Sequence, residues 1–364
     1  MFDGLYSGFT SDVYLRPDVF EAEMERVFAP SWLCLGFTDD LQSPNDFITR
    51  QIGKTNIVVQ NVKGTLRAFR NVCTHRFSRI QCEAKGNRPL TCPYHGWSFD
   101  GNGTPVGVPH NAKSFDLSDD DRQALRLEAF ALETCGRFVF VRMAADGPDL
   151  RGFLAGFYDI LEHLSDTCPE RFDSHQASWD FNWKLGMDNA AEGYHVPLVH
   201  PESFAAMLKP DLRLTAEGEH GYFLGDFREQ SVKWWAGVSK AIGLQTTPRY
   251  PEYACFLVFP NMVINMSWGG FYSALMFDPI GVDATAVNAG LFLGRNKGGA
   301  AREMIVAQLK DFSDKVRAED HGICVKVHQG LTSMATPRAP LLGKMEDACA
   351  HFHAVYANRM KGAL

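Results

Sequence analysis

The stretch CTHRFSRIQCEAKGNRPLTCPYHGW, residues 73–97, decides how the first part of this 364-residue chain folds. It holds two short pairs, Cys73-x-His75 and Cys92-x-x-His95, with sixteen residues between them. Four ligands of this kind bind either a structural zinc ion or an iron–sulfur cluster. The spacing within each pair distinguishes the two.

A zinc finger carries its two cysteines on one knuckle and its two histidines elsewhere, typically on a helix. Here each pair supplies one cysteine and one histidine. That division suits a two-iron, two-sulfide cluster in which one iron binds both cysteines and the other binds both histidines, the Rieske arrangement. We therefore assign Cys73 and Cys92 to one iron and His75 and His95 to the other. A structural zinc site is the alternative.

Composition and charge exclude several partners. The net charge is −7 and there is no basic excess, so neither nucleic acid nor an anionic membrane is an expected partner. No stretch approaches the roughly 20 apolar residues of a membrane helix. The nine cysteines are an odd number, and seven of them are scattered singly. With no signal-peptide pattern at the N-terminus, we expect reduced thiols and a cytoplasmic protein.

The hydrophobic period divides the chain into two predicted domains. A period of two begins near residue 45, and 46–52, 56–62 and 66–72 are predicted strands of a β-rich domain over 37–147. Residues 1–36, which include a predicted helix over 16–32, join 148–364 in a second domain. That domain has β-like runs at 254–268, 272–281 and 286–294, followed by helical patterns from Ala301. The fold class is α+β.

A second constellation lies in DNAAEGYHVPLVH, residues 188–200. His195 and His200 are five apart, so a regular helix would separate them by about 140°. Pro197 lies between them and predicts a kink or bulge, which could bring both imidazoles to one point. Two histidines alone are weak evidence for a metal, because most are core or surface residues.

A third ligand is suggested by burial in the helical segment 303–331. Its apolar stripe runs through Ile305, Leu309, Phe312 and Val316. Asp320 falls on this stripe, whereas Glu319 is rotated by about 100° from it. A carboxylate on an apolar stripe is costly unless it binds a metal or pairs with a buried Arg or Lys. Two histidines and one carboxylate make a facial triad, which leaves open positions for dioxygen on Fe(II).

Together and in this order, the two constellations resemble the Rieske non-haem iron oxygenases, the catalytic α subunits of ring-hydroxylating systems. The likeness covers nearly the whole chain, including VFEAEMERVFAPSW, NWKLGMDNAAEGYHVPLVHP and EDHGICVKVHQGL. It implies a mononuclear Fe(II) bound by His195, His200 and Asp320, with Asn189 close by and dioxygen as co-substrate. It also implies a helix-grip catalytic domain, an antiparallel sheet flanked by helices. One position departs from the family pattern, since Phe77 stands where glycine is usual.

Glu192 narrows the resemblance. Most ring-hydroxylating members have aspartate there, and glutamate with QGL at 329–331 and HFHAVY at 351–356 resembles the branch acting on choline, betaine and carnitine. The resemblance implies that Glu192 links His95 of one subunit to His195 of the next. That implies a head-to-tail homotrimer (α3), or an α3β3 assembly. An ordinary surface acid is the other interpretation of Glu192.

The implied enzyme is a terminal oxygenase that hydroxylates, dihydroxylates or demethylates a small organic substrate. The chain has no G-x-G-x-x-G fingerprint, so a separate ferredoxin or flavin reductase must supply its electrons. Trp234, Trp235, Trp268, Phe271 and Tyr272 could cage an alkylammonium group, although such residues are more often core. The sequence therefore leaves two substrate classes open, alkylammonium compounds and aromatic hydrocarbons. For the second class we expect a role in aromatic hydrocarbon catabolism. A Rieske electron carrier without an oxygenase site and a zinc-stabilised binding module are the alternatives.

Overall fold

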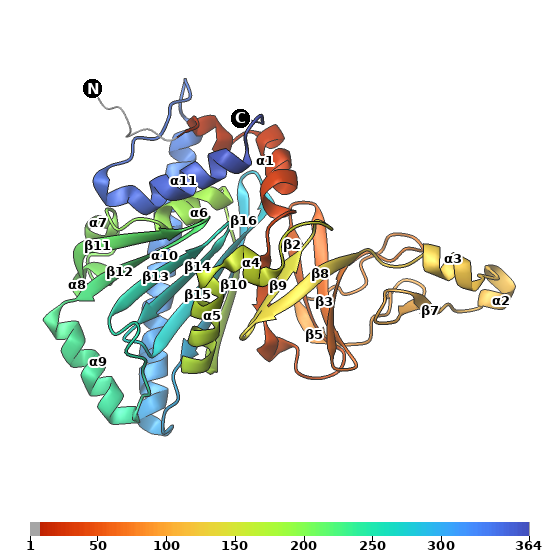
Figure 1. The fold of residues 1–364 in the computed structure, drawn as a ribbon, viewed down its shortest axis with the longest axis horizontal. Helices are drawn as coiled ribbons and strands as arrows, with labels where there is room; N and C mark the ends of the chain where they lie inside the picture. Colours follow the sequence, from red (N-terminus) through yellow and green to blue (C-terminus); the bar gives the residue numbers. More distant parts are fainter. Residues whose placement is uncertain (1–7, 364) are drawn as a thin grey trace. The chain divides into compact units, whose positions relative to one another are not determined.

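The computed structural model describes residues 8–363, and contacts within the chain divide it into two compact units (Figure 1). One unit contains the residues up to Val27 together with those from Leu154 onward, and the other spans Phe28–Phe153. Strands dominate the second unit, whereas the first combines one large sheet with most of the helices. The α+β class predicted from the sequence is confirmed. The domain limits predicted above stay a prediction.

A seven-stranded antiparallel sheet frames the unit Phe28–Phe153. In spatial order the strands are β1 (Leu33–Phe37), β9 (Phe138–Arg142), β8 (Ala129–Cys135), β4 (Thr65–Arg70), β3 (Thr55–Val62), β2 (Asp46–Ile52) and β5 (Lys85–Asn87). The strands predicted from the period of two are confirmed as β2, β3 and β4. Lys63 and Gly64 have φ angles of 53° and 91°, which suit the tight hairpin turn between β3 and β4.

The cysteine loops of this unit are anchored in its apolar core. Cys73 and Cys92 pack with Phe47, Val58, Phe69, Ile80, Leu90, Trp97, Phe99 and Leu127. Short elements complete the unit: η3 (Thr38–Asp40), β6 (Ser98–Phe99), β7 (Pro105–Gly107), α2 (Asn111–Ser114), α3 (Asp119–Ala124) and α4 (Leu150–Leu154). The apolar core therefore anchors both loops at their cysteines.

A second seven-stranded antiparallel sheet forms the centre of the other unit. Its spatial order is β10 (Glu170–Trp179), β16 (Ala284–Leu293), β15 (Phe271–Gly281), β14 (Met262–Ser267), β13 (Tyr253–Val258), β12 (His220–Phe227) and β11 (Leu208–Glu217). Successive side chains of each strand point to opposite faces. Phe256 of β13 therefore packs on Phe157 of the helix α5 (Gly156–Thr167), whereas Tyr253 faces the other way.

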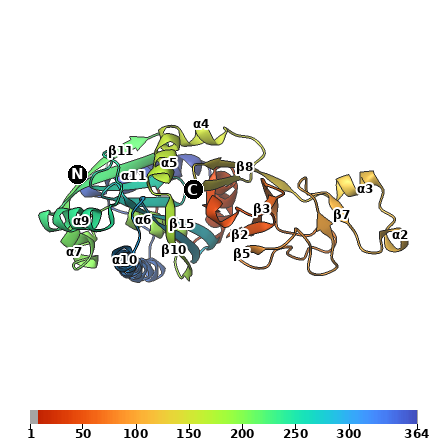
Figure 2. The same ribbon diagram turned by 90° about the horizontal axis from the view of Figure 1, so that it is seen from below.

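Helices cover both faces of this sheet, as Figure 2 shows. The 33-residue helix α10 (Ala300–Thr332) lies with α6 (Trp183–Ala190) on the face opposite to α5. The remaining helices are η1 (Ser11–Tyr14), α1 (Pro17–Glu23), η2 (Met24–Phe28), α7 (Val196–Val199), α8 (Phe204–Met207), α9 (Glu229–Ile242), η4 (Lys344–Glu346) and α11 (Asp347–Arg359). An antiparallel sheet flanked by helices was predicted, and it is confirmed. Within residues 8–363 no helix is both long and apolar enough to cross a membrane.

A buried ion pair ties α1 to α6. Glu23 and Lys184 are 0% and 1% exposed, and their Oε1 and Nζ atoms lie 2.5 Å apart. Trp183 Nε1 donates to Glu23 Oε2 (2.8 Å), and Tyr356 Oη donates to Oε1 (2.6 Å). Burial lowers the pKa of Lys184, although the charge of Glu23 opposes this. The N-terminal helix is thus bound to the helix that precedes both candidate histidine ligands.

Candidate functional site

The first cysteine loop closes on itself through two backbone hydrogen bonds. Cys73 N donates to Ser78 O (2.8 Å), and Phe77 N donates to Cys73 O (3.0 Å). Phe77 has φ = 62°, and its side chain is 78% exposed. A left-handed conformation costs a non-glycine residue roughly 1–2 kcal/mol. Phenylalanine at this position therefore preserves the turn that glycine usually forms, with some backbone strain.

The second loop repeats this geometry. Cys92 N donates to Trp97 O (2.8 Å), and Gly96 N donates to Cys92 O (3.0 Å). Gly96 has φ = 73°, so it occupies the same left-handed position that Phe77 holds in the first loop. Two loops of matching form present one cysteine and one histidine each, as expected for ligands that clamp a cluster from two sides.

The four side chains of these loops suit a Rieske cluster. Cys73 and Cys92 are 1% and 2% exposed, and burial beside Cys92 raises the pKa of the Cys73 thiol to about 11. His75 and His95 are half-buried, and their ring centroids are 4.7 Å apart. His75 Nδ1 is buried without a hydrogen-bond partner in the described part of the chain. Two buried thiols lie near two imidazoles, and one imidazole has a buried nitrogen without a hydrogen-bond partner among the described residues. These groups suit a cluster in which one iron binds two cysteines and the other binds two histidines.

The two candidate ligands of the second site do not share a kinked helix, so that prediction is wrong. Helix α6 ends at Ala190, and a new four-residue helix, α7, begins at Val196. His195 is its N-cap and His200 its C-cap, and Pro197 lies in its first turn. Proline is favourable there because the first amides of a helix have no intrahelical partner. The proline therefore starts a short helix whose two ends carry the two imidazoles.

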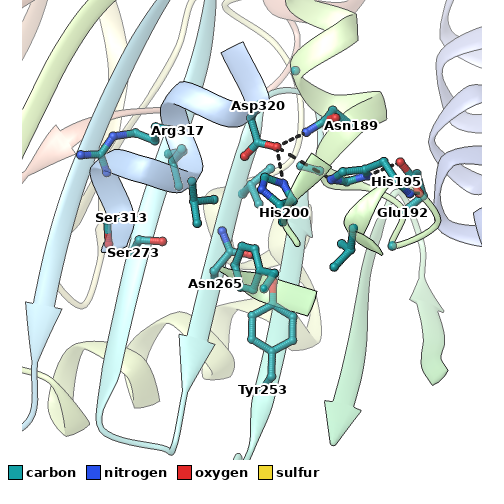
Figure 3. A pocket seen from close by; sticks show the side chains of 18 of the residues that line it. Asn189, Glu192, His195, His200, Tyr253, Asn265, Ser273, Ser313, Arg317 and Asp320 are labelled. Carbon is teal, nitrogen blue, oxygen red and sulfur yellow. Dashed lines mark hydrogen bonds and ion pairs between the residues drawn. The ribbon is translucent and has the colours of Figure 1, made fainter. Parts of the chain in front are cut away.

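His195, His200 and Asp320 converge, as Figure 3 shows. One potential ligand atom from each lies within 4.8 Å of the others. His200 Nε2 is 2.9 Å and His195 Nε2 is 3.8 Å from Asp320 Oδ1. The three residues come from α7 and α10, which are more than a hundred positions apart in the sequence. Two imidazoles and one carboxylate on one side of a metal form a facial triad.

A carboxylate contacts the Nδ1 atom of each imidazole. His195 Nδ1 contacts Glu192 Oε1, and His200 Nδ1 is 2.7 Å from Glu319 Oε2. Asn189 Nδ2 donates to Asp320 Oδ1 (2.7 Å). Carboxylates that bind Nδ1 of metal-ligating histidines fix the ring and leave Nε2 for the metal. The donor set and its supports therefore fit a mononuclear iron.

Glu319 was missed by the sequence reasoning, which noted it only as lying off the apolar stripe. Its carboxylate also accepts a hydrogen bond from Ser203 Oγ (2.7 Å). Burial acts to lower the pKa of His200, but hydrogen bonds and charges of Asp320 and Glu319 outweigh it and raise the pKa above its ordinary value. The available signal was a second acid directly before the candidate ligand Asp320. In the structure these two adjacent acids contact the two ring nitrogens of the same histidine, His200.

A cavity of about 110 Å³ opens beside the three ligands. Strands β12 to β15 contribute only odd-numbered residues to it, including Tyr253, Asn265, Ser267, Phe271 and Ser273. This period of two places every one of them on the sheet face toward α10. The opposite wall comes from one face of α10: Ser313, Val316, Arg317, Asp320 and Cys324. The cavity is mostly apolar, with a few polar groups.

The five aromatic residues that could cage an alkylammonium group do not all line one cavity. Of the five, only Phe271 lines the 110 Å³ cavity. Trp234 and Trp235 line a neighbouring hollow of about 400 Å³, which shares Ser267, Phe271 and Phe312 with the first. Tyr272 is buried and stacks on Phe292 with centroids 4.5 Å apart. The core interpretation is therefore correct for Tyr272.

Asp188 belongs to a separate buried network behind the site. It accepts from Tyr14 Oη (2.6 Å) and lies 2.8 Å from His353 Nε2, while Cys349 Sγ is 3.8 Å away. His353 belongs to the HFHAVY segment of α11. These contacts join η1, α6 and α11, so Asp188 supports the turn that leads to the ligands.

Two protein families match the two parts of this chain. Residues 166–362 match the ring hydroxylating alpha subunit (catalytic domain), and residues 31–130 match the Rieske 2Fe–2S domain. The chain belongs to the ring-hydroxylating alpha subunit family. A ring-hydroxylating alpha subunit with a Rieske domain implies a two-iron, two-sulfide cluster and a mononuclear iron. This ring-hydroxylating alpha subunit is thus a Rieske-type oxygenase, not a bare electron carrier or a zinc-stabilised module.

The chain is similar in sequence to the oxygenase subunits of named monooxygenases and dioxygenases. The carnitine monooxygenase oxygenase subunit of Escherichia coli is 28% identical over 370 residues, which cover 96% of this chain and 92% of that protein. The anthranilate 1,2-dioxygenase large subunit of Acinetobacter baylyi is 33% identical over 206 residues, 54% of this chain and 43% of that one. A solved quaternary ammonium Rieske monooxygenase in complex with L-carnitine has a TM-score of 0.78 at 23% identity, covering 97% and 95% of the two chains. That likeness confirms the fold.

Proposed function

We propose that this alpha subunit is the terminal component of an oxygenase and binds Fe(II) through His195, His200 and Asp320. The observation that carries the proposal is the convergence of three ligand atoms within 4.8 Å, beside a cavity. A ferrous ion in a facial triad keeps coordination positions open for dioxygen, and a Rieske cluster supplies electrons. Oxidation of a small organic substrate is the reaction class that these two groups support.

The residues around the ligands have defined tasks. Glu192 and Glu319 hold the Nδ1 atoms of the two histidines, so that both Nε2 atoms face Asp320. Asn189 keeps one oxygen of Asp320 engaged, which fixes the orientation of the carboxylate. The apolar side chains of the cavity exclude water around a bound substrate. A dry, preorganised site favours oxidation of the substrate over loss of reducing equivalents to solvent.

The cluster is held by Cys73, Cys92, His75 and His95, and its electrons come from a separate ferredoxin or flavin reductase. No dinucleotide fingerprint in the sequence supplies a donor within the chain. We further propose a head-to-tail homotrimer in which Glu192 connects His95 of a neighbouring subunit to His195. The contact of Glu192 with His195 supports the half of this bridge that lies within one chain.

The substrate belongs to one of two classes, an alkylammonium compound or an aromatic one. The named relatives include a carnitine monooxygenase and an anthranilate dioxygenase. The cavity is lined mostly by apolar side chains with a few polar groups, which is the usual lining of a small-molecule site and favours neither class. Hydroxylation, dihydroxylation and oxidative demethylation use the same ligand set.

Low-temperature electron paramagnetic resonance tests the two metal sites together. The dithionite-reduced protein is measured before and after the addition of nitric oxide. We expect a Rieske-type signal from a spin of one-half, and then a new iron–nitrosyl signal from a spin of three-halves. His195→Ala should lose the second signal and keep the first. If fully metal-loaded wild-type protein gave the Rieske signal alone, the mononuclear site would be rejected.

The role of Glu192 has a separate test. Glu192→Gln should retain both metal signals, because glutamine can still accept a hydrogen bond from His195. It should slow reoxidation of the cluster by dioxygen in the presence of substrate by about tenfold or more, as for other partners of metal ligands. Glu202→Gln, an exposed acid near α8, is the matched control. Unchanged reoxidation in the Glu192 variant would contradict the proposed bridge.

A further inference from the structure

Arg317 is a buried cation without a complete set of partners. It is 6% exposed, and it is the one cationic side chain among the described residues that line the 110 Å³ cavity. One amino group pairs with Asp314, a partly exposed residue on the same helix. Its Nε is buried and has no hydrogen-bond partner in the described part of the chain. Since a buried guanidinium with unmade hydrogen bonds is costly, an occupant of the cavity is the natural partner.

The position of Arg317 relates it directly to the ligand set. It lies three residues before Asp320 on α10, and both side chains line the cavity. Residues three apart on a helix have Cβ atoms about 5–6 Å apart. In the view of Figure 3, Arg317 lies to one side of Asp320, and His195 and Glu192 lie to the other. In that view the guanidinium points away from the three ligands, so a molecule that meets both must span the cavity along α10.

Polar groups on the facing sheet can complete the recognition. Asn265 on β14 and Ser273 on β15 are register partners and line the cavity. Asn265 Oδ1 accepts a hydrogen bond from Tyr253 Oη (2.7 Å), which leaves its amide nitrogen to donate. Glu192 and Asp320, the acids of the cavity, are engaged with histidines. The groups left for a substrate thus include the amide nitrogen of Asn265, the hydroxyl of Ser273, which can donate or accept, and one cation.

We propose that Arg317 binds a carboxylate of the substrate and so makes this site selective for carboxylate-bearing molecules. A planar guanidinium pairs with carboxylates through two parallel hydrogen bonds, which gives orientation as well as affinity. The carboxylate at Arg317 would place the rest of the molecule toward His195, His200 and Asp320. This inference rests on the proposed function and narrows it, because both an aromatic acid and an alkylammonium acid meet the requirement.

Binding calorimetry on the oxidised, metal-loaded protein tests this with two pairs of small molecules. Benzoate is compared with benzyl alcohol, and glycine betaine with choline. We expect the carboxylate member of one pair or both to bind at least tenfold more tightly than its partner. The pair that shows the preference identifies the aromatic or the alkylammonium class. No preference in either pair overturns the proposal, and this result needs no variant.

Variants assign the preference to Arg317. Arg317→Met should weaken carboxylate binding by about 10–100-fold and leave the uncharged or cationic partner unchanged within about twofold. Asp314 keeps Lys310 as a partner at 2.8 Å, so the variant leaves no unpaired acid. Arg317→Lys should retain part of the preference. Lys326→Met removes an exposed cation from the same helix and should have no effect. A preference that survives in folded Arg317→Met overturns the assignment.

The iron–nitrosyl signal of the same preparation separates this inference from the proposed function. Carboxylate selectivity without that signal would reject the mononuclear iron and retain the role of Arg317. The signal without selectivity would retain the oxygenase site and reject the role of Arg317.

Discussion

Asn189 and Asp320 are 131 positions apart in the sequence, yet Asn189 Nδ2 donates to Asp320 Oδ1 across 2.7 Å. The same oxygen lies 2.9 Å from His200 Nε2. This contact joins α6 to α10 at the point where the candidate ligands meet. The amide thus acts through Asp320 as a positioning residue, and it links α6, the helix that precedes both histidines, to the helix that carries the acid.

Asn189→Ala should weaken Fe(II) binding at the triad by about 10–100-fold, because Asp320 loses the hydrogen bond that orients it. Titration of Fe(II) into metal-free sites, followed by the iron–nitrosyl signal, measures this. The Rieske signal of the same sample is the internal reference. Asn296→Ala removes a similar amide–carboxylate bond, to Glu170 at 2.8 Å, away from the ligands. Equal losses in both variants would contradict the positioning role.

Cys92→Ser should abolish the Rieske cluster and leave the mononuclear site able to bind iron, because the two sites lie in different compact units. Visible absorption and the one-half-spin signal report the cluster, and the nitrosyl signal reports the second site. Cys82→Ser, at the exposed cysteine of the same unit, should keep the full cluster. Retention of a Rieske signal in Cys92→Ser would show that this cysteine is not a ligand.

Glu23→Gln should lower the free energy of unfolding by about 3–5 kcal/mol, because it leaves the buried Lys184 ammonium without its counter-charge. Chemical denaturation of the protein, followed by its tryptophan fluorescence, measures the change in the free energy of unfolding. The double variant Glu23→Met, Lys184→Met should lose much less, since no buried charge remains unpaired. Glu25→Gln, an exposed acid in the next turn, is the control. A loss equal to that of the control would mean that the ion pair contributes nothing.

The contributions of His163 and His328 to stability should fall as the pH drops below about 6.5, the ordinary pKa of histidine. Burial lowers the pKa of His163 and of His328, with Asp283 opposing the shift at His328. A folded-state pKa below the unfolded one means that the unfolded chain binds more protons between the two values, so stability rises with pH through that window and is level above it. Thermal unfolding between pH 5 and 8 checks this (roughly the window of histidine titration). His328→Leu should flatten the profile, and an unchanged slope would rule out its contribution.

Much of the architecture follows from local patterns. The period of two over 46–72 predicts β2, β3 and β4, and an apolar stripe predicts α10 with Asp320 on its buried side. Those patterns work because burial repeats at the period of the element itself. The prediction of a kinked helix was wrong because the local pattern around Pro197 fits two different structures. Pro197 is compatible with either a distorted helix or a new one, and in the structure it lies in the first turn of a new helix, α7.

The sequence by itself predicted the ligand types, since the two Cys-and-His pairs and the two histidines lie in short motifs, and the carboxylate lies on the apolar stripe of its helix. Only the tertiary structure showed which atoms these ligands and their neighbours contact. The contacts of Glu319 and Asn189, and the place of Arg317 beside the cavity, come from the packing of α10 against α6, α7 and the sheet. Distances between segments more than a hundred residues apart depend on packing free energy spread over the whole unit, and no local pattern encodes them.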